Sequence, residues 1–248
     1  MNENESLREL LFSLIEERKS ETKRKSVFRY TMLIGFILIL ILVFFSPIDN
    51  DAITKEHTAL IEVNGIISPE TETNGEKIIP HVLSAMENPL CLGIIIKINS
   101  PGGSATQSKL IHDQIIKLRT KHNKPIYSVI EDVGASGGYY IAVSTEKIFS
   151  DSTSIVGSIG VRIDKLNFKS LLQKLGIEPI TLTAGNDKTI LDPFSSLSDK
   201  HKKHLNSLLL EIHNQFISDV KESRGKLLVD DNVFSGLFWT GSQAKDLG

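Results

Sequence analysis

Residues 92–104 read LGIIIKINSPGGS, an apolar run that ends in a polar segment with paired glycines. A short apolar run bounded by turn residues is typical of a buried strand. We therefore expect a strand over 92–98 and a turn at Pro101-Gly102-Gly103. A helix with apolar positions at helical spacing follows, and Ser104 is placed to cap its first turn.

The same arrangement recurs further along the chain. Residues 126–130 predict another strand, which leads into Gly134-Ala135-Ser136-Gly137-Gly138 and then a helical stretch at 139–143. An earlier strand is expected at 59–63. Strands that alternate with helices indicate an α/β fold. Such folds place ligands and chemistry in the loops at the carboxyl ends of parallel strands, so both glycine loops are candidate sites.

Composition excludes several classes of function. The 248 residues are 40% hydrophobic and 23% charged, as in ordinary globular proteins. The net charge of −2 provides no broad positive field, so nucleic acid is not an expected partner. Cys91 is the only cysteine, which rules out an internal disulfide or a multi-cysteine zinc site, and its apolar surroundings predict a core position.

Residues 30–45 read YTMLIGFILILILVFF and carry no charge. With residues 46–48 this run approaches the length of about 20 residues that a membrane-spanning helix needs. A cleaved signal peptide is the competing interpretation. A polar arm of 29 residues before the run and the absence of a small-residue cleavage site after it favour an uncleaved anchor.

The basic residues around this run predict its orientation. Only Lys55 follows it closely, whereas six precede it: Arg18, Lys19, Lys23, Arg24, Lys25 and Arg29. The positive-inside rule then keeps the N-terminus in the cytosol and places the body of the protein outside the cytoplasm, on the inner (cytoplasmic) membrane. The expected segments are a cytosolic arm over 1–29, a single-pass anchor over 30–48, a linker over 49–57 and one folded domain over 58–248.

Ser136 stands in surroundings that suit a nucleophile. A serine nucleophile needs a sharp turn, small neighbours and N–H donors for the developing oxyanion. Glycines permit such a turn, and the start of a helix leaves N–H groups unpaired. The Gly137 N–H is one candidate donor, and the Gly103 N–H from the other loop is the second. By itself the run also fits a tight strand-to-helix connection, whereas a phosphate-binding P-loop pattern is absent from both loops.

Taken together, the motifs resemble a known family. In order, they are Ile98-Asn99-Ser100-Pro101-Gly102-Gly103, Gly134-Ala135-Ser136-Gly137-Gly138-Tyr139-Tyr140, Ile155-Val156-Gly157-Ser158-Ile159-Gly160-Val161, a block over 184–194 that contains Lys188, and Phe238-Trp239-Thr240-Gly241-Ser242-Gln243-Ala244. This series is similar to the signal peptide peptidase A (protease IV) family in its short, single-domain form. The resemblance spans about residues 59–248.

The resemblance implies a fold and an activity. The family's fold resembles the Clp protease and crotonase spiral of β-β-α units, here preceded by one transmembrane helix. Members are membrane-bound serine peptidases that cleave peptides in or near the membrane, including the remnants of signal peptides, without a cofactor. Short forms assemble into rings, so a homo-oligomer is expected. The family usually continues into a further strand beyond the position of Gly248.

The resemblance also implies roles for single residues. Ser136 matches the catalytic serine and Lys188 the catalytic lysine, and in ring-forming members the two meet across neighbouring subunits. A lysine can accept a proton only in its neutral form, which burial in an apolar cleft favours. Ser158 is a candidate to orient that amine. Asp187 and Asp192 would hold the lysine in its charged form by pairing with it, so this mechanism predicts that both point elsewhere.

Other mechanisms fit parts of the sequence. His201, His204 and His213 fall on an expected helix over 199–223, but His204 and His213 point to opposite sides of it, so no metal site is expected there. The paired glycine loops also suit crotonase-type acyl-thioester chemistry. A third alternative is an inactive, ring-forming membrane scaffold. The anchor and the lysine block argue against the crotonase alternative, and the presence of both Ser136 and Lys188 argues against the scaffold.

Overall fold

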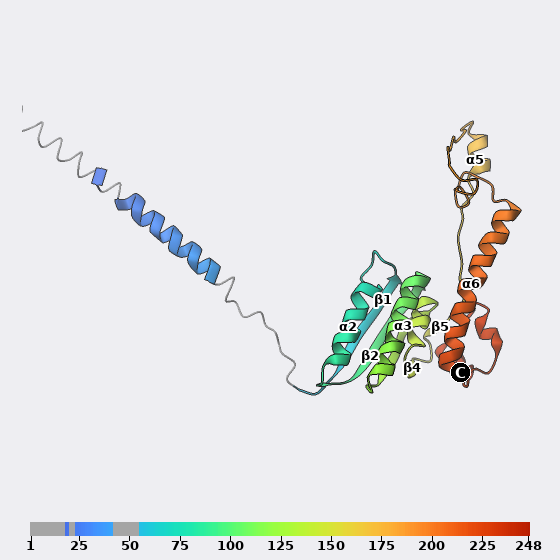
Figure 1. Ribbon diagram of the computed structural model, residues 1–248, viewed down its shortest axis with the longest axis horizontal. Coiled ribbons are helices and arrows are strands. Elements are labelled where there is room, and N and C mark those ends of the chain that lie inside the picture. Colours follow the sequence, from blue (N-terminus) through green and yellow to red (C-terminus); the bar gives the residue numbers. More distant parts are fainter. Residues whose placement is uncertain (1–17, 20–22, 42–54) are drawn as a thin grey trace, which may run out of the picture. The chain divides into compact units, whose positions relative to one another are not determined.

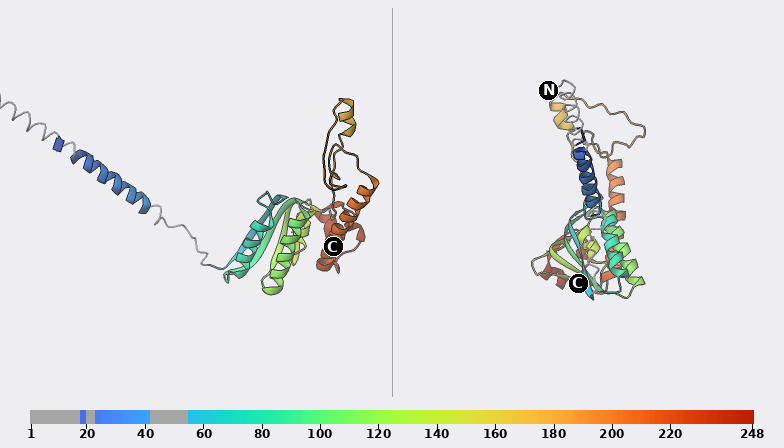
Figure 2. Two further views of the ribbon diagram at one scale, coloured as in Figure 1. Left: turned by 45° about the horizontal axis from the view of Figure 1, so that its top comes forward. Right: turned by 90° about the vertical axis from the view of Figure 1, so that its left-hand side faces the viewer.

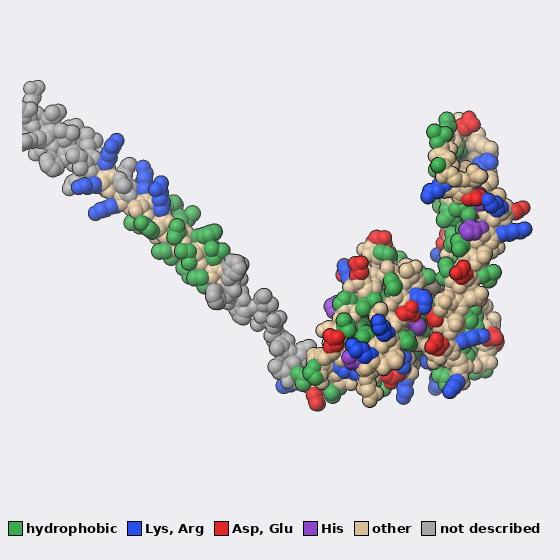
Figure 3. Space-filling model, viewed as in Figure 1, with side chains coloured by type: hydrophobic (Ala, Val, Ile, Leu, Met, Phe, Trp, Pro, Cys, Tyr) green, Lys and Arg blue, Asp and Glu red, His purple; other side chains and the backbone are tan. Residues whose placement is uncertain are grey.

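The computed structural model describes residues 18–19, 23–41 and 55–248 (Figure 1). The chain divides into two compact units, Met1–Ile53 and Thr54–Gly248. In the first unit, residues 23–41 form a helix whose apolar side chains are exposed (Figure 3). The predicted boundaries of the arm, anchor, linker and folded domain stay predictions.

Within the described part of the chain, no helix is both long and apolar enough to cross a membrane. Helix 23–41 contains the first part of the predicted anchor, whereas residues 42–48 lie outside the described residues. Residues 1–17 of the predicted arm lie outside them as well. The anchor over 30–48 therefore stays a prediction.

The second unit is built on a mostly parallel sheet. Its strands are β1 (His57–Ile67), β2 (Cys91–Gly103), β3 (Ile126–Ala135), β4 (Lys147–Ser150), β5 (Ile155–Gly157) and β6 (Phe238–Thr240). They are ordered β1-β2-β3-β5-β6, and β4 pairs with the first half of β3. Only the pairing of β5 with β6 is antiparallel among these strands. The predicted α/β class is confirmed, and the finer prediction of a spiral of β-β-α units stays a prediction.

One face of the sheet forms the core. Along β2, Ile94, Ile96 and Ile98 are at most 1% exposed, because side chains in a strand alternate between faces and these share one. Buried residues of β1 and β3 extend this face. Cys91 is 1% exposed, as predicted for a core position.

Three helices provide the partners of this core: α2 (Gly75–Glu87), α3 (Ala105–Lys121) and α4 (Gly137–Ala142). Figures 1 and 2 show α2 and α3 side by side over the sheet, and α4 contacts α3, β2 and β3. The predicted cap of α3 is confirmed, since the Ser104 Oγ accepts the Gln107 N–H at 3.3 Å. A buried helix face against a parallel sheet is the usual layer arrangement of α/β domains.

The first glycine loop differs from the sequence prediction. A free turn was expected at residues 101–103, but β2 continues through Gly103. After a register shift, Gly102 and Gly103 pair with Ile66 and Ile67 of β1. The Ser100 hydroxyl supports the shift, because it donates to the Gly65 carbonyl at 2.6 Å and accepts the Gly102 N–H at 3.1 Å. Local turn propensity was overridden by pairing with a neighbouring strand.

The remaining elements follow β5. They are α5 (Lys169–Lys174), α6 (Asp199–Arg224), the short 3-10 helix η1 (Asp231–Phe234), and α7 (Gly241–Asp246) after β6. The helix predicted over 199–223 is confirmed as α6. Figures 1 and 2 show the segment that carries α5 projecting away from the sheet. Most of its residues are exposed, so it adds little to the core.

The core predicts a clear difference between two positions on β2. We expect Ile98→Ala to lower the free energy of unfolding by about 2–5 kcal/mol, because it removes a fully buried side chain and leaves a cavity. Leu92→Ala is the matched control, since Leu92 is 55% exposed on the same strand. Urea unfolding followed by circular dichroism measures both, and equal losses would contradict this account of the core.

Candidate active site

Ser136 occupies a strained turn between β3 and α4. Its φ of +51° and ψ of −119° lie in a region that residues with a side chain rarely adopt. Two hydrogen bonds hold it: its N–H donates to the Gly157 carbonyl at 2.8 Å, and its carbonyl accepts the Tyr140 N–H at 2.9 Å. Ser136 caps α4 without using its hydroxyl for the cap. The side chain is half-buried, and its Oγ is left available for chemistry.

Two glycine segments meet at this turn. A Cβ on Gly102 would lie 2.6 Å from the Gly137 nitrogen and 2.8 Å from the Ser136 Cβ. A Cβ on Gly137 would lie 3.3 Å from the Gly103 nitrogen. The structure therefore brings Gly102 and Gly103 next to Ser136 and Gly137, although the two pairs are far apart in the sequence. Only glycine at 102 allows the backbones to approach this closely.

The Gly137 N–H lies in the first turn of α4, where helices leave N–H groups without an internal partner. Among the described residues no hydrogen bond is formed by this N–H. It is thus free to donate to a ligand next to Ser136. Because α4 is only six residues long, the candidate donors are this one N–H group and the adjacent Gly103 N–H, not a helix dipole.

Ser158 directly follows β5, the strand that pairs with the end of β3 before the Ser136 turn. Its φ is +53°, and its N–H donates to the Leu237 carbonyl at 2.7 Å. Ser136 and Ser158 are the two non-glycine residues with positive φ in the described part of the chain. The preceding residue, Gly157, accepts the Ser136 N–H, so the two serines are linked through one peptide. Strained backbone of this kind clusters at functional sites.

Lys188 is not brought to Ser136 within this chain. It is exposed on the projecting segment, where its N–H donates to the Gly185 carbonyl at 3.2 Å. Figures 1 and 2 show that this segment extends away from the sheet that carries Ser136. No ion pair or side-chain hydrogen bond of Lys188 is formed among the described residues.

The two neighbouring carboxylates, which were predicted not to pair with Lys188, have other hydrogen-bond partners. Asp187 accepts from Lys200 at 2.5 Å and from His201 at 2.8 Å. The Lys200 and His201 hydrogen bonds hold the pKa of Asp187 below its usual value. Asp192 accepts the Phe194 N–H at 3.2 Å. Among the described residues, neither carboxylate forms an ion pair with Lys188.

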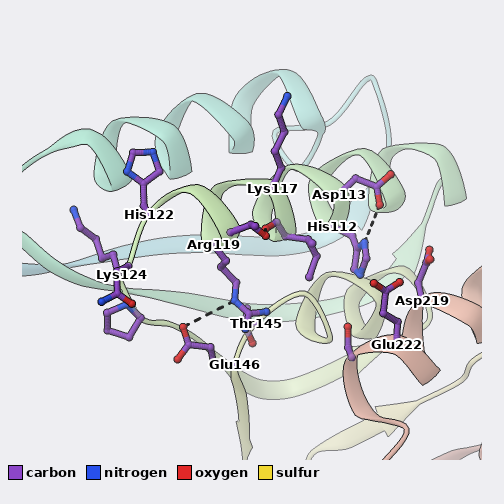
Figure 4. A pocket seen from close by; sticks show the side chains of 15 residues that line it. His112, Asp113, Lys117, Arg119, His122, Lys124, Thr145, Glu146, Asp219 and Glu222 are labelled. Carbon is purple, nitrogen blue, oxygen red and sulfur yellow. Dashed lines mark hydrogen bonds and ion pairs between the residues drawn. The ribbon is translucent and has the colours of Figure 1, made fainter.

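A separate surface pocket of about 730 Å³ lies between α3, the loop before β3 and α6 (Figure 4). It is lined by charged and polar residues and does not include Ser136 or Lys188. His112, Asp113 and Asp219 come close enough there to suggest a cation site. The Lys109 ammonium already lies 3.0 Å from Asp113 and 3.3 Å from Asp219, so a cationic side chain fills that role.

Two residues near the site were not singled out from the sequence. Tyr140 follows Ser136 by one turn of α4, and its hydroxyl donates to the buried Asp219 carboxylate of α6. The sequence did contain an indication. Asp219 lies three residues after Phe216 on the apolar stripe of the predicted helix, a position where a carboxylate is unexpected.

A strand-to-helix turn with a strained serine, set against paired glycines on an α/β sheet, is an arrangement that serine hydrolases use. Comparison with known sequences agrees with this class. The profile of Peptidase family S49 matches residues 119–248, just over half of the chain. The chain belongs to peptidase family S49. The matched residues include Ser136, Ser158 and Lys188, whereas Gly102 and Gly103 precede them.

Several curated proteins are similar over much of the chain. The putative signal peptide peptidase SppA of Enterococcus faecium is 30% identical over 190 residues, covering 71% of this chain and 55% of that protein. The putative protease slr0021 of Synechocystis is 31% identical over 196 residues, covering 79% and 69%. A Brucella abortus protein named Na(+)/H(+) antiporter NhaA is 48% identical over 156 residues, covering 62% of this chain but 21% of that protein. The chain thus spans between about a fifth and about half of the length of the first curated relatives that it matches.

The close approach of Gly102 to the Ser136 turn predicts the effect of adding one methyl group. We expect Gly102→Ala to slow the labelling of Ser136 by a fluorophosphonate about a hundredfold, because the new Cβ displaces the Gly137 backbone. Gly65→Ala is the control: Gly65 also has a positive φ, +72°, but its Cβ would have nothing within 4 Å. Backbone strain of about 1–2 kcal/mol is common to both variants. Equal labelling rates for Gly102→Ala and Gly65→Ala would therefore contradict the close contact at Gly102.

Proposed function

We propose that this chain is a serine endopeptidase in which Ser136 attacks the peptide carbonyl. The observation that carries the proposal is the strained Ser136 turn, with an available Oγ next to the unpaired Gly137 N–H. Membership of peptidase family S49 supports it. Binding of a carbonyl oxygen by the Gly137 and Gly103 N–H groups would stabilise the negative charge that develops during attack.

Lys188 is the proposed general base. It would take the Ser136 hydroxyl proton during attack and return it to the leaving amine. Since Lys188 lies on the projecting segment, we propose that it serves the Ser136 of a second copy of this chain. Exposed apolar side chains on the same segment support an interface there, with Ile180 86% and Leu182 92% exposed. Ser158, next to the Gly157 contact of Ser136, would orient the incoming amine.

The substrates proposed here are extended apolar peptides, including signal peptide remnants. The name of the Enterococcus relative, putative signal peptide peptidase, supports this class of substrate. No charged side chain is required by the proposed oxyanion contacts, which use backbone N–H groups and therefore tolerate many sequences.

A membrane anchor over residues 30–48 is also part of the proposal. Exposed apolar side chains along helix 23–41 support it, since such a surface is stable only when something apolar covers it (Figure 3). The basic residues before this run favour a cytosolic N-terminus and a peptidase domain outside the cytoplasm. An anchored peptidase would meet apolar peptides where they leave the membrane.

The shared-site mechanism predicts complementation between two inactive variants. We expect Ser136→Ala and Lys188→Ala each to lose turnover of a fluorogenic apolar peptide. When the two are mixed and reassembled, about a quarter of the unmodified activity should return, because random heterologous contacts pair an intact serine with an intact lysine in one case out of four. The rate of peptide cleavage in detergent is the measurement.

The two single variants and their mixture test the nucleophile, the base and the shared site separately. Turnover retained in the Ser136→Ala variant alone would reject the nucleophile, and turnover retained in Lys188→Ala alone would reject the base. Two inactive variants whose mixture stays inactive after confirmed co-assembly would place both residues in one subunit.

The anchor can be tested by alkaline carbonate extraction of membranes from cells that express the full chain. We expect the unmodified protein to stay in the membrane pellet. Lysines in place of Ile37 and Leu38, which are 46% and 54% exposed, should release it, because a charge at the centre of a spanning helix costs about 2.5–3.5 kcal/mol. Release of the unmodified protein would reject the anchor.

A further inference from the structure

The position of Ser136 depends on how α4 is seated. All six residues of α4 are buried, and the helix begins directly at the Ser136 turn. The Tyr140 N–H donates to the Ser136 carbonyl at 2.9 Å, so Tyr140 is joined to the turn through the helix backbone. A movement of Tyr140 along the helix axis would therefore shift Ser136 and the Gly137 N–H together.

The Tyr140 side chain is held from both sides and at its tip. Its ring stacks on Phe216 of α6, with centroids 4.2 Å apart, and lies 5.2 Å from the His112 ring of α3. Its hydroxyl donates to the Asp219 carboxylate. Burial, followed by the adjacent Asp219 carboxylate, raises the pKa of Tyr140, so the phenol keeps its proton and stays a donor.

Asp219 is a buried carboxylate, 7% exposed, and would be costly without partners. Besides Tyr140, it accepts from Gln215 at 2.9 Å on its own helix and from Lys109 at 3.3 Å on α3. Burial opposes the charge on Lys109, but the carboxylates of Asp113 and Asp219 outweigh it and raise the pKa of Lys109. Figure 4 shows His112, Asp113 and Asp219 converging where α3 faces α6.

We propose that Tyr140 and Asp219 are positioning residues for the nucleophile: their hydrogen bond fixes α4 against α6 and thereby keeps Ser136 and the Gly137 N–H aligned. This inference rests on the proposed function of Ser136. Neither residue touches the substrate. They act by holding a turn whose own backbone conformation is unfavourable and which therefore needs external restraint.

Packing alone does not explain this pair. A phenylalanine at position 140 would keep the stacking on Phe216 and bury no hydroxyl, and Asp219 would keep Gln215 and Lys109 as donors. Buried polar pairs often contribute little net stability compared with apolar residues of similar shape. What the hydroxyl adds is direction, because a hydrogen bond fixes the ring along its axis whereas stacking permits it to slide.

The test compares Tyr140→Phe with Tyr139→Phe in the purified full-length protein, using kcat and KM for a fluorogenic apolar peptide. Tyr139 is the adjacent buried residue on α4, 8% exposed against 4% for Tyr140, and within the described residues its hydroxyl forms no hydrogen bond. We expect Tyr140→Phe to lower kcat by between about tenfold and a hundredfold, as a small misplacement of a reacting group does. KM should stay within about twofold, and Tyr139→Phe should match the unmodified protein.

A double-mutant cycle with Asp219→Asn shows whether the pair acts as a unit. If one hydrogen bond carries the effect, Tyr140→Phe with Asp219→Asn should be no slower than the slower single variant. Circular dichroism at the assay temperature accompanies each measurement. A loss of kcat that only follows loss of folded protein would assign the hydroxyl to stability and overturn the proposal.

Ser136→Ala, measured in parallel, separates the two proposals. Turnover retained in Ser136→Ala rejects the proposed function and the positioning role with it. An inactive Ser136→Ala beside a Tyr140→Phe variant of unchanged kcat overturns the positioning role alone, as does an equal loss in Tyr139→Phe.

Discussion

The close contact between Gly102 and the Ser136 turn is the constraint on which the rest of the site depends. A side chain at position 102 would meet the Gly137 nitrogen at 2.6 Å, so the two backbones touch without anything between them. The Gly103 nitrogen lies close to Gly137 as well, 3.3 Å from where a Gly137 Cβ would be. Ser136 itself has an unusual φ of +51°, and its N–H donates to the Gly157 carbonyl at 2.8 Å. Strain persists here because the surrounding structure restrains the turn from several sides.

The parallel sheet explains why these segments meet. Ser100 pairs with Gly134, and Ala135 pairs with Gly157, so β2, β3 and β5 end side by side. The carboxyl ends of parallel strands lie at the same edge of a sheet, and each contributes one segment to the site there. Residues 102–103, 136–137 and 158 are distant in sequence but share this edge. The proposed attack by Ser136 on a peptide carbonyl thus depends on the order of the strands more than on any single loop.

Two features of the molecule act at different distances from the serine. Near it, the buried Asp219 and its three partners tie α4 to α3 and α6, which limits how far the turn can relax. Far from it, the projecting segment carries Lys188 and exposed apolar side chains. The Ser136 turn on the sheet and the proposed base, Lys188, on the projecting segment suit the proposal of a site that is completed by assembly. Such an arrangement would link peptidase activity to the oligomeric state.

Much of the fold could be read from local pattern, because apolar periodicity, glycine runs and caps act over a few residues. The strands around 59–63, 92–98 and 126–130, the cap at Ser104 and helix α6 were predicted and are present. Ser136 was singled out because small residues flank it. The tertiary structure alone decided that residues 101–103 remain paired as a strand, that Gly102 contacts the Ser136 turn, and that Lys188 lies apart from it. It also decided that Tyr140 meets Asp219, 79 residues away. These features depend on register and packing between distant segments, and no local pattern carries that information.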